Sequence, residues 1–109
     1  MIVAGRKLVF QQGFLDALHI LEQWANQSNP RGGRVLVKRV VDFVSDIVAP
    51  FPLSFPAFSL SVAPPRPLRR AVLDRRYAVI YEVRETELLL VHVYSTYQNP
   101  DLLKLLTAK

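Results

Sequence analysis

The chain has 109 residues, half of them hydrophobic and 21% charged, which is typical of one globular domain, here residues 1–109. It contains no cysteine, so disulfides, thiolate metal sites and a cysteine nucleophile are excluded. We expect a cytoplasmic protein, because no apolar run approaches the ~18 residues of a membrane span and the first residues lack a secretory pattern. The formal net charge of +5 favours an acidic partner over the alternative of a basic domain that is simply soluble.

The first part of the chain predicts a short strand followed by a helical hairpin. Arg6–Phe10 alternates as a strand, and from Gln12 to Gln27 the apolar residues recur at helical spacing. A second, valine-rich helix follows Asn29–Pro30, starting a few residues later because Gly32 and Gly33 weaken its first turn. The short link predicts two antiparallel helices that share one core.

The segment Pro50–Pro67 carries six of the eight prolines, so neither a helix nor a central strand can run through it. It also carries large apolar residues, such as Phe51, Phe55 and Phe58. These predict an extended segment packed over the body; the alternative, a disordered loop, would leave several aromatic rings in water.

Three strands are predicted next, at 68–73, 77–83 and 87–94, joined by short polar turns as an antiparallel meander. Tyr77–Val83 is apolar on both faces, which suits a central strand covered by helices on one side. Asn99–Pro100 predicts the start of a short C-terminal helix. The fold class is therefore α+β: an N-terminal strand and an antiparallel helical hairpin packed on a small, mainly antiparallel sheet, with a short C-terminal helix.

Motifs for metabolic chemistry are missing from the sequence. His19 and His92 lie far apart and in no metal-ligand spacing, and we expect His92, within an apolar strand, to be a satisfied structural residue. No phosphate-binding glycine loop or nucleophile motif occurs, and Glu82, Glu85 and Glu87 are expected at a solvated turn. We expect no cofactor, no metal, no small-molecule substrate and no membrane partner.

Most of the excess charge lies between Arg66 and Arg76, where five arginines face one acid, Asp74, for +4 of the total +5. Arginines interleaved with exposed aromatic residues are typical of an RNA surface, through phosphate contact and base stacking. One alternative is that the tyrosines are core and the arginines solvate an edge strand. Another is an acidic, partly disordered protein partner that wraps the same surface. The residues concerned are Arg69, Arg70, Arg75, Arg76, Tyr81, Tyr97 and Gln98.

The runs LRRAVLDRRYAVIYEV and LLLVHVYSTYQNP, and the order of elements over the whole chain, resemble the RelE/ParE toxins of bacterial type II toxin–antitoxin systems. The resemblance implies a growth inhibitor neutralised by a cognate antitoxin. In one branch the toxin poisons DNA gyrase by binding; in the other it is a metal-independent, ribosome-dependent mRNA endonuclease. A degenerate member would only bind antitoxin or nucleic acid.

Two positions depart from the family pattern and bear on the choice between the branches. Where RNA-cleaving members have an Arg after the first aromatic residue of the central strand, this chain has Ala78, and where an Arg commonly precedes the tail it has Tyr97. These departures favour inhibition by binding to a target such as gyrase. RNA cleavage would need Arg76, Arg75 or Arg69 to supply the missing charge. Tyr97 would then stack on a base or donate a proton, which makes Arg76 and Tyr97 the catalytic candidates.

Overall fold

The computed structural model describes residues 1–58 and 67–97. The predicted C-terminal helix, Gln98 and the middle of the proline-rich segment lie outside these ranges. The helices are α1 (Gln12–Ser28) and α2 (Gly32–Phe43), continued by a π-helical turn, η1 (Val44–Val48), and followed by a short 3-10 helix, η2 (Pro52–Ser54). The strands are β1 (Ile2–Val3), β2 (Arg6–Phe10), β3 (Ala57–Phe58), β4 (Leu68–Leu73), β5 (Tyr77–Val83) and β6 (Glu87–Ser95).

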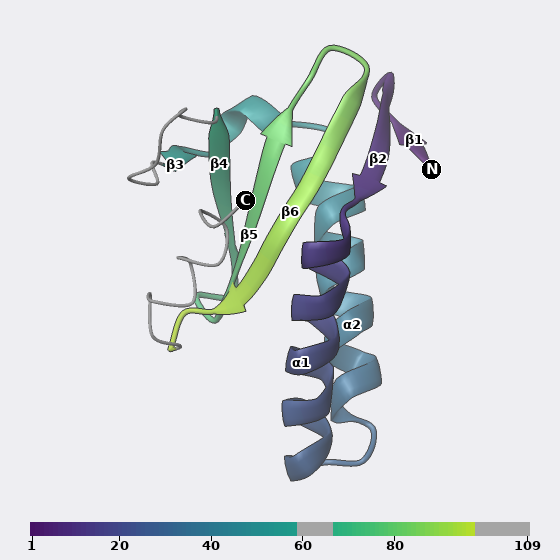
Figure 1. Cartoon of the computed structure of the whole chain (residues 1–109), viewed down its shortest axis with the longest axis vertical. Coiled ribbons are helices and arrows are strands. Elements are labelled where there is room, and N and C mark those ends of the chain that lie inside the picture. Colours follow the sequence, from purple (N-terminus) through teal and green to yellow (C-terminus); the bar gives the residue numbers. More distant parts are fainter. Residues whose placement is uncertain (59–66, 98–109) are drawn as a thin grey trace.

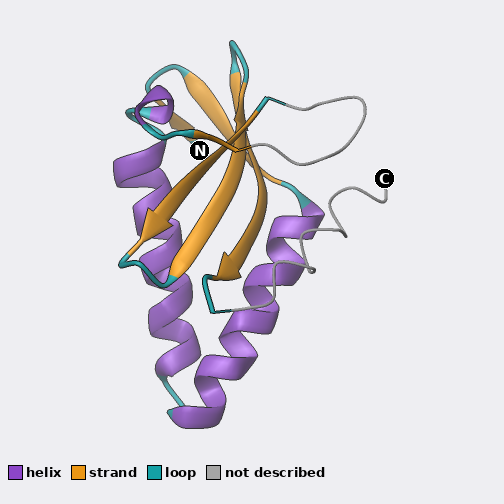
Figure 2. Cartoon of the chain, turned by 90° about the vertical axis from the view of Figure 1, so that its left-hand side faces the viewer, coloured by secondary structure: helices purple, strands orange, loops and turns teal. Residues whose placement is uncertain are grey.

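The strands form one mixed sheet in the order β1-β2-β6-β5-β4-β3. All neighbouring pairs are antiparallel except β2 and β6, which are parallel. A parallel pair needs a long crossover, and here the chain leaves β2 through the whole helical hairpin before it returns to the sheet. The hairpin of α1 and α2 extends beyond one end of the sheet, as both views show (Figures 1 and 2).

The main core lies between the helices and one face of the sheet. Helix α1 contributes a buried stripe, since Phe14, Leu18 and Leu21 follow the helical period. The alternation of β5 turns Val79 and Tyr81 towards this core and Ala78 and Ile80 to the opposite face. We call that opposite face, turned away from the helices, the far face. Its buried residues are Leu68, Ala78, Ile80, Leu89, Val91 and Tyr94.

The predicted α+β architecture is confirmed, as are the first strand, the helical hairpin and the three-stranded meander. Three details differ. The second helix changes to π-helical hydrogen bonding at Val44, and two strands of two residues each, β1 and β3, extend the sheet at its edges. The proline-rich segment is not uniformly extended, because it opens with the 3-10 turn η2 before β3. In the described ranges, no helix is both long and apolar enough to cross a membrane.

Candidate functional site

The β4–β5 turn and the end of β6 bring three sequence-predicted site residues to one end of the sheet. Asp74 and Arg75 adopt left-handed backbone angles, with φ of 52° and 60°. The turn is held to β6 because the Thr96 amide donates to the Arg76 carbonyl (2.7 Å) and the Thr96 hydroxyl donates to the Arg75 carbonyl (2.8 Å). Arg75 and Arg76 are exposed, and Tyr97 is 83% exposed beside this junction. We call Arg75, Arg76 and Tyr97 the basic end.

Arg69 and Arg70 are neighbours in β4 and therefore point to opposite faces of the sheet. Arg69 lies across from Tyr81, and its Nη1 donates to the Phe55 carbonyl at 2.6 Å, which ties it to the segment before β3. The Arg70 guanidinium lies on the far face, with its Cζ 5.7 Å from the centre of the Tyr94 ring. Arg70 is therefore the arginine of this pair that is placed on the far face.

Tyr81 does not belong to a binding surface. Its side chain is fully buried in the helix-covered core, and its hydroxyl donates to the Pro52 carbonyl at 2.6 Å. Burial raises the pKa of Tyr81 to about 12. We therefore correct its assignment from surface to core; the alternative that the tyrosines are core residues holds for Tyr81 and Tyr94, whereas Tyr97 is exposed.

The sequence predicts that His92 is a structural residue whose hydrogen bonds are satisfied, and the structure corrects this prediction. The β5–β6 register runs Ile80 to His92 and then Tyr81 to Leu90, so Val91 is an extra residue, a β-bulge. The bulge turns His92 to the far face, where its ring stacks near Tyr94 with centroids 6.0 Å apart. Its Nε2 is buried without a hydrogen-bond partner in the described ranges. Burial also lowers the pKa of the imidazole.

Glu82 is another correction, because it is not part of a solvated turn. It is only 6% exposed, and Arg84 Nε donates to its carboxylate at 2.6 Å. The carboxylate beside it raises the pKa of the Arg84 guanidinium. Glu85, by contrast, is exposed as expected. On the far face, Glu82 is the next residue of β5 after Ile80, which pairs with Arg70 and His92. An acid that is ion-paired with Arg84 therefore lies beside these two residues.

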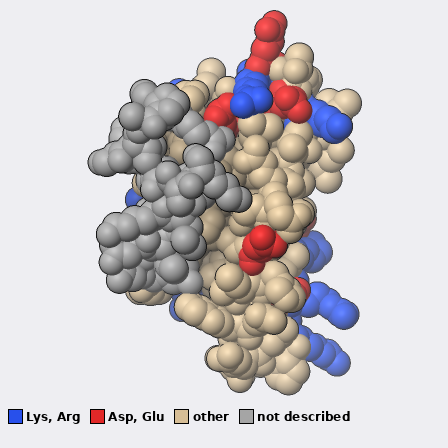
Figure 3. Space-filling view, viewed as in Figure 1, with Lys and Arg blue, Asp and Glu red and all other residues tan. Residues whose placement is uncertain are grey.

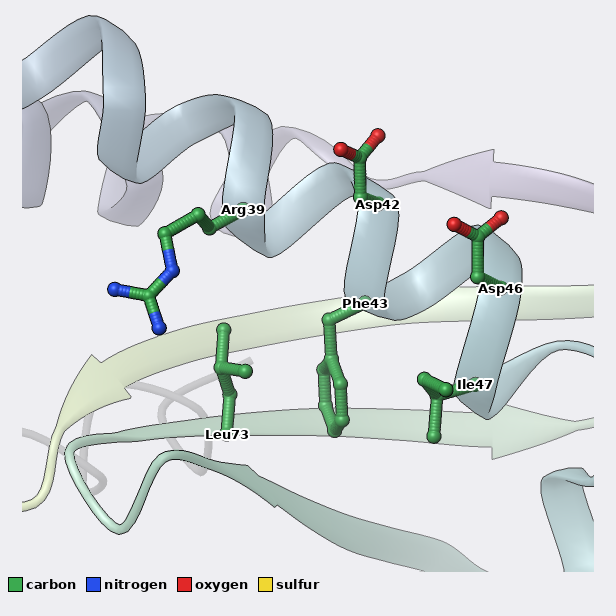
Figure 4. A pocket seen from close by; sticks show the side chains of 6 residues that line it. All are labelled: Arg39, Asp42, Phe43, Asp46, Ile47 and Leu73. Carbon is green, nitrogen blue, oxygen red and sulfur yellow. The ribbon is translucent and has the colours of Figure 1, made fainter.

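A shallow hollow of about 270 Å³ lies between the end of α2, η1 and β4. Phe43, Ile47 and Leu73 form its apolar floor, while Asp42 and Asp46 point away from the strands (Figure 4). The remaining lining residue, Arg39, is ion-paired with Asp74 of the β4–β5 turn. Asp42 is paired with Lys38. The Arg39–Asp74 pair joins the helix to the turn. We therefore interpret this hollow as structural and assign no chemistry to it.

The structure adds a basic surface that the sequence reasoning missed. Arg31, Arg34 and Lys38 are exposed at helical spacing along the start of α2. Figure 3 shows basic side chains gathered along this helix, whereas the opposite end of the molecule, over the β5–β6 turn, mixes acidic and basic groups. The spacing of three and four positions between these residues could have revealed this surface from the sequence. No group of three potential metal ligands occurs within residues 1–58 and 67–97.

The fold defines the class of protein to compare: a helical hairpin covers one face of a mixed sheet in which β2 runs parallel to the last strand, β6. No family model and no curated protein matches the sequence. Among solved structures, a chain of the toxin–antitoxin complex RelBE2 from Mycobacterium tuberculosis is similar, with a TM-score of 0.60 and 19% identity. The match covers 90% of this chain and 97% of that one, so the resemblance expected from the sequence is confirmed at the level of the fold.

Proposed function

We propose that this chain is the toxin of a toxin–antitoxin pair, a growth inhibitor held inactive by a cognate antitoxin. The observation that carries the proposal is the fold shared with a chain of the RelBE2 toxin–antitoxin complex over nearly the full length of both chains. The net charge of +5 and the exposed arginines of the basic end suit an acidic antitoxin.

Two targets follow from the resemblance, gyrase and ribosome-associated mRNA. The sequence favours gyrase because Ala78 and Tyr97 replace expected arginines. One structural observation supports mRNA instead: Ala78 lies in register between Val72 and Tyr94, and Arg70 from β4 reaches the Tyr94 ring across this row. A guanidinium from the neighbouring strand therefore lies close to the position where the chain lacks one. For this reason we place RNA first and gyrase second.

Induced expression from a tightly repressed promoter tests the proposal. Growth should stop on induction and resume when the product of the adjacent gene is co-expressed. Rapid translation arrest with cleaved mRNA would support the RNA target, and a supercoiling defect with intact mRNA would support gyrase. Normal growth at a verified level of folded protein would contradict the toxin assignment and leave a degenerate member that only binds.

A further inference from the structure

Helix α1 carries a second apolar stripe besides the one that it buries in the main core. This stripe consists of residues that are four, three and four positions apart, so they share one side of the helix: Gly13, Ala17, Ile20 and Trp24. Ala17 is buried, whereas Ile20 is 47% and Trp24 51% exposed. We call these four residues the α1 stripe, and Ile20 and Trp24 its exposed part.

The exposed part of the α1 stripe is apolar and has little charge around it. Two large apolar side chains on successive turns make one continuous patch, and such patches mark surfaces that another segment covers. Gln23 and Gln27, on the same side of the helix, are exposed and neutral. The nearest acid on this side, Asp16, accepts a hydrogen bond from within the helix. The patch therefore suits an apolar segment better than a charged ligand.

The α1 stripe begins against β6, where that strand has lost its neighbour in the sheet. Strand β2 pairs with β6 only as far as Phe10 and Leu90. Beyond this point α1 lies beside β6, because a Cβ built at Gly13 would lie 3.4 Å from the carbonyl oxygen of Val91. Figure 1 shows that α1 and β6 then run in the same general direction, with β6 leaning away from the helix.

The end of β6 lies at the level of the exposed part of the stripe. The strand rises about 13 Å over the four residues from Val91 to Ser95. Helix α1 rises about 10 Å from Gly13 to Ile20 and about 16 Å from Gly13 to Trp24. The chain therefore leaves the sheet beside the level at which α1 exposes its apolar side chains.

Residues 98–109, which lie outside the described ranges, continue from this place. Their sequence, QNPDLLKLLTAK, predicts a short helix that starts at Asn99–Pro100. At about 100° per residue its four leucines fall within an arc of roughly 160°, with Lys104 on the opposite side. The leucines are Leu102, Leu103, Leu105 and Leu106. Such a segment needs an apolar surface with little charge, which is what the exposed part of the stripe offers.

The chain is already anchored where this segment begins. The amide and the hydroxyl of Thr96 donate to the carbonyls of Arg76 and Arg75, and Tyr97 follows directly. A segment attached through a short link has an effective concentration in the range of about 1 mM at a neighbouring surface. Its leucines therefore have an advantage over a free peptide or a second molecule for the same patch.

We propose that residues 98–109 dock as a short helix on α1, with their leucines against Ile20 and Trp24. Docking covers the exposed part of the α1 stripe. It also holds Tyr97 between two fixed points, the Thr96 contacts with the β4–β5 turn and the docked segment, and so positions the aromatic ring of the basic end. The inference goes beyond the proposed function, because it concerns packing of the chain and is independent of growth inhibition.

Trp24 is the only tryptophan of the chain and reports directly on this contact. The measurement is acrylamide quenching of its fluorescence in the purified full chain near neutral pH. The double variant Leu102→Ser/Leu106→Ser should raise the quenching constant about twofold, since a ring that is half exposed on the helix alone loses its cover. Lys104→Ser makes the same replacement on the opposite side of the predicted helix and should leave the quenching constant unchanged.

A second measurement uses the unmodified chain, so its result does not depend on how a variant folds. Nuclear Overhauser contacts are expected between the Trp24 indole and the methyl groups of Leu102 or Leu106. Equal quenching in the parent and the double variant, or leucine methyl contacts with Ile80 of the far face instead of the indole, would overturn the docking. Protection of Trp24 that appears only with dimerisation would assign the patch to a second copy, and protection that needs an added antitoxin would assign it to that partner.

Discussion

The hydroxyl of Tyr81, in the central strand, donates a hydrogen bond of 2.6 Å to the carbonyl of Pro52. The two residues lie 29 positions apart, and the bond is buried. It fixes the start of the proline-rich segment against the sheet, where proline cannot supply amide donors of its own. Pro52 is itself buried, which confirms for this part of the segment that it packs on the body.

We expect Tyr81→Phe to lower the free energy of unfolding by about 1–3 kcal/mol, because it leaves a buried carbonyl without its donor. Urea unfolding at pH 7 measures this loss. The matched control is Tyr77→Phe, a half-buried tyrosine at the end of the same strand. A loss for Tyr81→Phe no larger than for Tyr77→Phe would show that the bond contributes little.

The same hydroxyl makes an alkaline prediction. The folded chain raises the pKa of Tyr81 to about 12, whereas the unfolded chain titrates near 10.0. Because the pKa of Tyr81 is higher in the folded chain, its contribution to the free energy of unfolding is fully present below pH 10. This contribution is lost as the pH rises from about 10 to 12. Tyr81→Phe should therefore lose less stability than the parent between pH 9.5 and 11. Parallel stability curves for the two proteins would contradict the assignment.

Gly33, in α2, lies in close contact with α1. A Cβ built at this position would lie 2.5 Å from the Glu22 carbonyl oxygen and 2.6 Å from Asn26 Oδ1. That same Asn26 oxygen accepts the Gly33 amide at 2.9 Å. Gly33→Ala should destabilise by about 1–3 kcal/mol, the usual cost of overpacking, despite the better helix propensity of alanine.

Gly13→Ala is the matched control, because its Cβ would lie 3.4 Å from the Val91 carbonyl oxygen, an ordinary contact. Near the start of α1 this substitution should be neutral or stabilise by up to about 1 kcal/mol. Thermal unfolding of both variants checks the pair. Equal effects at the two positions would mean that the helices adjust freely at Gly33.

Periodicity predicted the helices and the meander because their apolar residues repeat at 3.6 or 2 positions, and these repeats decide which side is buried. It did not predict the role of Gly33, which appeared only as a weak helix start. A close approach of two helices depends on their tertiary packing. Nor did it predict β1 and β3, which have two residues each and carry no periodic pattern.

The candidate site could be predicted in part for a similar reason. The concentration of arginine selected a candidate binding stretch, and the structure brings Arg75, Arg76 and Tyr97 to one end of the sheet, while binding there stays a prediction. The bulge at Val91 was invisible because it depends on which residues pair between strands. Without the bulge, alternation would place His92 on the helix-covered face instead of the far face.

The ion pair between Arg39 and Asp74 joins α2 to the β4–β5 turn, with both side chains about half exposed. Exposed pairs contribute little, so Arg39→Gln should cost no more than about 1 kcal/mol of stability. The difference from the parent should shrink in 1 M salt, where screening is strong. Guanidine would itself screen the pair, so urea unfolding at two salt concentrations is the measurement. A salt-independent loss above about 2 kcal/mol would show that Arg39 acts through packing of its stem instead.

His92 should make the folded chain sensitive to mild acid. Burial lowers its pKa below the ordinary value of 6.5, so around and below that pH the unfolded chain binds more protons than the folded one. Stability is therefore highest when the imidazole is neutral and is lost as the pH falls through about 6.5. His92→Phe keeps a ring against Tyr94 but removes the titration, so it should flatten the stability curve between pH 7 and 5. If His92→Phe loses stability over this range as steeply as the parent, the acid sensitivity comes from other groups and the imidazole is already free to protonate in the folded chain.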